Sequence, residues 1–136
     1  MSETSSGQQA AAVAVFDPFA GADPAVSALR DALRAEGVDA EITSDPASAV
    51  AADGLVVAAS GDAAEALRVL RNTQVDRVVG QRLAGSRPVL VVGAAMDALF
   101  ERAADGAAGF GEWPGGVVKL DAPVERAAVA AADGSQ

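Results

Sequence analysis

Short apolar runs and longer amphipathic stretches alternate along the chain. Three runs are rich in valine and show no polar alternation, at residues 11–16, 54–59 and 88–92. This pattern is typical of strands buried on both faces of a parallel sheet. Residues 38–42 instead alternate apolar with acidic side chains, which predicts a strand near the sheet edge with one face in water. A last strand is predicted near residues 117–120.

The stretches between these runs carry helix signals. The first helix is predicted to begin at Asp23-Pro24, where Asp caps the helix and Pro takes its first turn, and to end at Gly37. Further helical segments are predicted through residue 50, after residue 62, over residues 75–83 and after residue 93. Three arginines are interpreted as a solvated helix face, namely Arg77, Arg82 and Arg87.

Strands and helices that alternate at this spacing predict a βαβ series and a mostly parallel, doubly wound sheet. Three segments are expected. Residues 1–10 are polar and predict a disordered tail, residues 11–121 form one α/β domain, and residues 122–136 form a C-terminal tail. A chain of 136 residues is long enough for one domain with a substantial core.

Composition narrows the chemistry. The chain contains no cysteine, no histidine and no tyrosine, which excludes disulfides, thiolate metal sites, cysteine nucleophiles and imidazole acid–base catalysis within it. A net charge of −9 disfavours nucleic acid and anionic membranes as partners, since both need a basic surface. No apolar run has the length of a membrane helix, and the N-terminus has no basic residue of a signal peptide. We therefore expect a cytoplasmic protein.

Ligands of doubly wound sheets bind at the carboxyl ends of the strands. That rim is predicted to carry Asp17, Ser60, Gly61, Asp62 and Asp97. The three aspartates could hold a hard cation, but helix capping and strand termination are the favoured explanation, so no metal and no cofactor are predicted. The amides around Ser60 and Gly61 could bind an anion, although a plain turn is favoured.

Large apolar side chains are scarce, because aromatic residues make up only 4% of the chain. Trp113 is an interface candidate, since tryptophan is enriched at binding hot spots, but it could equally cover the end of the sheet. Phe19 and Phe110 are further interface candidates.

Several fragments, in this order and spacing, resemble a known family. They are ADGLVV at 52–57, RPVL at 87–90, MDALFE at 96–101, GEWPG at 111–115 and LDAPV at 120–124. The chain resembles the glutaminase subunit of imidazole glycerol phosphate synthase, a class I glutamine amidotransferase, from about residue 12 to residue 124. The resemblance implies a flavodoxin-like, three-layer α/β/α domain, here shortened at the C-terminus, and a role related to histidine biosynthesis.

The resemblance also places the family's functional positions. Its nucleophile elbow, of the form G-x-C-x-G, falls on Val91 to Ala95, so that Gly93 stands at the nucleophile position. The family's catalytic His and Glu lie in a C-terminal portion without a counterpart here. Glycine adopts a strained elbow geometry without cost, so we expect Gly93 to keep an elbow-like turn with a positive φ.

These observations lead to two hypotheses about function. The first is a catalytically inactive glutaminase pseudoenzyme that acts as a structural, scaffolding or regulatory subunit of a biosynthetic enzyme. Its partner would be a second copy or a (β/α)₈ cyclase-like subunit, because a shortened sheet should leave a strand edge and an apolar surface open. The alternative is a re-purposed small-ligand or metal site at the rim, with a non-cysteine enzymatic activity.

Overall fold

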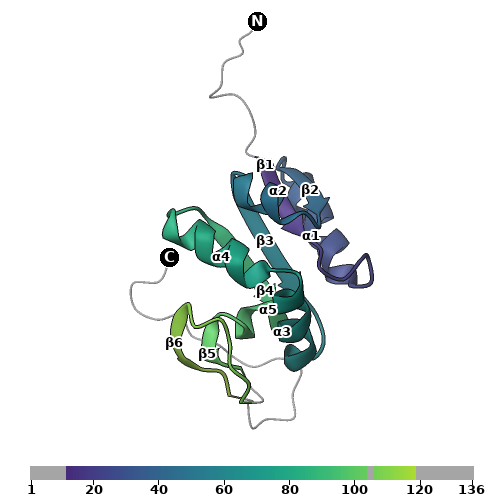
Figure 1. The fold of residues 1–136 in the computed structure, drawn as a ribbon. Helices are drawn as coiled ribbons and strands as arrows, with labels where there is room; N and C mark the ends of the chain where they lie inside the picture. The colour runs from purple at the N-terminus through teal and green to yellow at the C-terminus, as the bar shows by residue number, and fades with distance from the viewer. Residues whose placement is uncertain (1–11, 104–105, 119–136) are drawn as a thin grey trace, which may run out of the picture.

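The fold is built around a parallel sheet of four strands (Figure 1). The computed structural model describes residues 12–103 and 106–118. The strand order is β2-β1-β3-β4, with β1 at Ala12–Phe16, β2 at Asp39–Thr43, β3 at Gly54–Ala59 and β4 at Val89–Gly93. All three strand pairings are parallel, which confirms the predicted sheet.

Helices cover both faces of this sheet. They are α1 at Pro24–Ala35, α2 at Pro46–Ala51, α3 at Ala63–Asn72, α4 at Val75–Ala84 and α5 at Ala94–Asp97. Neighbouring strand residues point to opposite faces, so they divide between two cores. Val15 and Val56 pack on the α1 side with Val26, whereas Phe16 and Val57 pack with the other four helices.

A second, smaller sheet follows α5. It pairs β5 at Phe100–Arg102 with β6 at Trp113–Gly116. The strand predicted near residues 117–120 lies partly outside the described residues. The strand that the structure describes in this region is β6, which begins four residues earlier and pairs outside the main sheet. β6 contains a proline and two glycines, so it lacks the apolar run that predicts a strand.

Sequence-based capping signals account for where three of the helices begin. Asp23, Asp45 and Asp62 each accept a hydrogen bond from a backbone amide in the first turn, as expected for N-cap residues. Pro24 and Pro46 follow two of these caps. No helix among the described residues is long and apolar enough to cross a membrane. Both predicted tails, residues 1–10 and 122–136, lie outside the described residues.

The prediction that Arg82 faces water is wrong. Arg82 is fully buried, and its guanidinium donates to the carbonyl oxygens of five residues at the amino end of the sheet. These acceptors are Ala49, Val50, Ala52, Asp53 and Pro88, at 2.6–3.2 Å. Burial, together with the like charge of Arg87, lowers the pKa of Arg82 from its ordinary value. The carbonyls stabilise this charge because they include the C-terminal end of α2.

Candidate functional site

The turn from β4 into α5 is centred on Gly93. Its φ is 71° and its ψ is −142°, which confirms the predicted positive φ at this position. Such a combination lies close to a region that only glycine populates without strain. The turn leaves Gly93 exposed at the carboxyl end of the sheet, where strand-end sites of this fold class lie.

The space around Gly93 is as restrictive as its backbone. An added Cβ would lie 2.3 Å from the carbonyl oxygen of Ala59, the residue that pairs with Gly93 across β3 and β4. This contact is far inside van der Waals distance and involves backbone, so any side chain here requires the two strands to move. Glycine is therefore required both by conformation and by packing.

Asp17 directly follows β1 and organises the loop that begins there. Its two carboxylate oxygens accept hydrogen bonds from the amides of Phe19 and Gly21, at 2.9 and 2.8 Å. This local use of the carboxylate is typical of an aspartate turn. The side chain is thus engaged by its own loop.

Asp23 connects the loops after β1 and β3. Besides capping α1, its carboxylate accepts from the amide and the hydroxyl of Ser60, each at 2.8 Å. Burial raises the pKa of Asp23, but hydrogen bonds from Ser60 and Ala25 outweigh it, and the pKa is lowered overall. The Ser60 amide, which was considered as part of an anion site, therefore already donates to the carboxylate of Asp23. Sequence reasoning identified Asp23 as a cap but missed this second contact.

The other predicted rim residues do not converge. Asp62 accepts from the amide of Glu65 at the start of α3. Asp97 is half-buried at the end of α5, and burial raises the pKa of its carboxyl. Within residues 12–103 and 106–118, no group of three or more acidic side chains is placed to hold a metal ion. A ligand-binding role stays a prediction for the five rim residues: Asp17, Ser60, Gly61, Asp62 and Asp97.

The three aromatic interface candidates occupy different environments. Phe19 packs against both cores, whereas the guanidinium of Arg71 lies over the ring of Phe110, 5.8 Å from its centre. Trp113 is 47% exposed and meets Phe100 edge to face, with ring centres 5.5 Å apart. Trp113 also lines an apolar groove of about 180 Å³ beside β4. Its exposure leaves it free to contact another molecule.

Comparison with known proteins gives consistent relatives. No family model matches the chain. The imidazole glycerol phosphate synthase subunit HisH of Thermobifida fusca (strain YX) is 50% identical over 102 residues, which are 71% of this chain and 48% of that protein. The subunit of the same name from Nocardia farcinica (strain IFM 10152) is 46% identical over 101 residues, 72% of this chain and 47% of that protein. The chain thus spans about half the length of the curated relatives it matches.

Among solved structures, a putative peptidase E protein from Listeria monocytogenes EGD-e is similar. The match has a TM-score of 0.58 at 17% sequence identity and covers 74% of this chain and 55% of that one. At this identity the likeness concerns the fold alone. It confirms the α/β architecture with a mostly parallel central sheet.

The comparisons correct the prediction that the chain is a pseudoenzyme and not an enzyme. The matched relatives carry the name of a synthase subunit, so they point to an enzyme family. The prediction inferred missing activity from the absent cysteine and from the absent segment that carries the family's His and Glu. The chain matches only about half of each relative, so the residue types it lacks do not decide whether the protein is active.

The predicted resemblance is confirmed by relatives at 40–50% identity that share one name. The chain is a homologue of imidazole glycerol phosphate synthase subunit HisH that corresponds to about half of that protein.

Proposed function

We propose that the chain works in histidine biosynthesis as a HisH-related binding subunit, with a (β/α)₈ cyclase-like protein as its partner. The observation that carries the proposal is the 50% identity to HisH. The matched segment includes β4, the elbow at Gly93 and α5. Such a subunit would act in the cytoplasm. The name of the relatives describes a subunit, so a protein partner is inherent in the proposal.

The carboxyl-end rim is the proposed contact surface. The loop after β1 is held by Asp17 and linked to the loop after β3 through Asp23 and Ser60. Preorganised loops lose little conformational entropy on binding, which favours association. Phe19 belongs to this loop and the Gly93 elbow lies on the same end of the sheet, so both would lie at the partner's surface.

The chain offers a matched pair of variants for testing this surface. Ala22 and Ala28 are both exposed, Ala22 in the rim loop and Ala28 on α1. We expect the purified chain to form a one-to-one complex with the (β/α)₈ subunit of imidazole glycerol phosphate synthase from the same cell, measured by light scattering and calorimetry. Ala22→Arg should weaken the complex at least tenfold, whereas Ala28→Arg should leave it unchanged.

Thermobifida fusca HisH, mixed with its own (β/α)₈ partner, serves as the positive control for the assay. The absence of a complex at micromolar concentration would overturn the proposed function. Equal weakening by both arginine variants would show that the rim is not the contact surface.

A further inference from the structure

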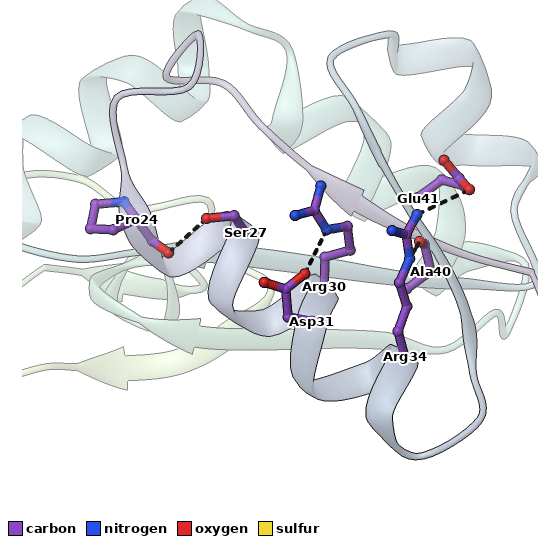
Figure 2. A network of polar contacts seen from close by, with 7 residues as sticks. All are labelled: Pro24, Ser27, Arg30, Asp31, Arg34, Ala40 and Glu41. Atoms are coloured by element: carbon purple, nitrogen blue, oxygen red, sulfur yellow. Dashed lines mark hydrogen bonds and ion pairs between the residues drawn. The ribbon is translucent and has the colours of Figure 1, made fainter.

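The outer side of β2 is occupied by a side chain of α1. Arg34 lies in the last turn of α1, and its Nε donates to the carbonyl oxygen of Ala40 at 2.8 Å (Figure 2). A terminal nitrogen of the same guanidinium meets the carboxylate of Glu41 at 3.2 Å. Figure 2 also shows Arg30, whose guanidinium pairs with Asp31 of the same helix. The two arginines of α1 thus have different partners, one on the helix itself and one on the strand.

The carbonyl group of Ala40 points away from β1. The amide of Asp17 donates to the carbonyl oxygen of Thr43, so Thr43 directs its backbone groups toward β1. The register of β1 with β2 is regular over all five residue pairs, so the backbone direction alternates along β2. Ala40 and Ile42 therefore direct their backbone groups outward, to the side where a further strand would lie.

Arg34 fills the position that a further strand would need. The amide nitrogen of a neighbouring strand ordinarily lies about 2.9–3.0 Å from the carbonyl oxygen it binds, and the Nε of Arg34 lies at 2.8 Å. Neighbouring side chains of a strand point to opposite faces, and Ala40 belongs to the core on the α1 side, so Glu41 points to the other face. The guanidinium contacts both residues and hence lies across the edge of the strand. The group that is present there identifies β2 as an outer strand.

The charge of Glu41 is a second obstacle to pairing at this edge. Proteins commonly protect edge strands with charged side chains, because unpaired backbone groups can bind another chain. Two copies of β2 that met about a two-fold axis would run antiparallel, and Glu41 is the middle residue of the strand. The Glu41 carboxylates of the two copies would then lie side by side, and like charges directly opposite each other destabilise a strand pair.

We propose that Arg34 and Glu41 together prevent strand addition at the β2 edge, and that without them this edge binds the β2 edge of a second copy. A two-fold axis through position 41 would place Ala40 of each copy opposite Ile42 of the other. Both residues direct their backbone outward, so each such pair would exchange two hydrogen bonds. The inference concerns the β2 edge and not the carboxyl-end rim, so it and the proposed cyclase partner can fail independently.

Two matched double variants test this role. Arg34→Ala with Glu41→Ala removes the groups at the edge, whereas Arg30→Ala with Asp31→Ala removes an ion pair from α1 alone. Each variant loses one positive and one negative side chain, so the net charge of −9 is the same in both. At micromolar concentration, light scattering should give the first variant twice the mass of the wild-type chain and the control the wild-type mass. All four side chains are partly exposed, so both variants are expected to fold, which circular dichroism can verify.

Amide hydrogen exchange identifies the strand that pairs. The outward amide of Ile42 should exchange rapidly in the wild type and roughly tenfold more slowly, or slower still, in the Arg34→Ala/Glu41→Ala variant. The amide of Thr43 faces β1 and should be protected in both. An unchanged mass of this variant would overturn the proposal, as would a doubled mass of the control or an Ile42 amide already protected in the wild type. If the alanine variant does not fold, Arg34→Gln with Glu41→Gln removes the same charges with less loss of side-chain bulk, and the same results are expected.

Discussion

The elbow at Gly93 yields the sharpest prediction about stability. Replacing Gly93 with alanine adds a single methyl group, yet this group encounters two obstacles. The backbone must keep φ 71° and ψ −142°, which costs a non-glycine residue about 1–3 kcal/mol. The new Cβ would also lie 2.3 Å from the carbonyl oxygen of Ala59, and relieving such overpacking typically costs another 1–3 kcal/mol or so.

We therefore expect Gly93→Ala to lower the free energy of unfolding by roughly 2–6 kcal/mol, a large part of the ~5–15 kcal/mol typical of a domain. A thiol introduced as Gly93→Cys would meet the same obstacles, because its Cβ occupies the same place. A cysteine at this position, which the resemblance aligned with the family's nucleophile, would thus require β3 and β4 to separate locally.

Gly37 provides the matched control. Its φ is +83°, but nothing lies within 4 Å of an added Cβ. Gly37→Ala should therefore cost only the conformational penalty of about 1–2 kcal/mol. Urea denaturation of both variants, with unchanged m-values, measures the difference. If Gly93→Ala were no more destabilising than Gly37→Ala, the steric argument at Ala59 would be refuted.

Three further substitutions test individual polar groups. Arg82→Lys should lower the free energy of unfolding by about 2–4 kcal/mol in chemical denaturation, since one ammonium cannot satisfy five carbonyls; an unchanged stability would contradict the role given to these hydrogen bonds. Asp23 has a lowered pKa, so its stabilisation is present above 3.8 and lost as the pH falls through the lowered pKa. Asp23→Asn should flatten the stability profile in that acidic range, and parallel profiles would argue against the bridge to Ser60. Asp97 has a raised pKa, so the wild type loses stability as the pH rises from 3.8 through that pKa. Thermal melts of Asp97→Asn should not show this loss.

Local sequence signals predicted the regular part of the fold. Valine-rich runs marked β1, β3 and β4, and Asp-Pro pairs marked the starts of α1 and α2, because burial and capping leave traces within a few residues. The same signals failed where the partner is remote in sequence. The contact of Asp23 with Ser60 spans 37 positions and has no local pattern.

Arg82 illustrates the same limit for burial. On α4 it lies on the same face as Val75, Val78 and Val79, so its position indicated burial and only its residue type suggested water. Its acceptors are backbone carbonyls that no side-chain pattern reports. At the rim, the sequence correctly identified Asp62 as a cap and Gly93 as a positive-φ turn.

The guanidinium of Arg82 has a consequence for folding kinetics. Four of its acceptors lie 29–33 residues earlier in the chain, and the fifth lies six residues later. These bonds require α2, α4 and the starts of β3 and β4 to be in place together, so they should form after the folding transition state. Interactions absent from the transition state act on the unfolding rate. Arg82 should therefore lower the rate of unfolding and leave the rate of folding nearly unchanged.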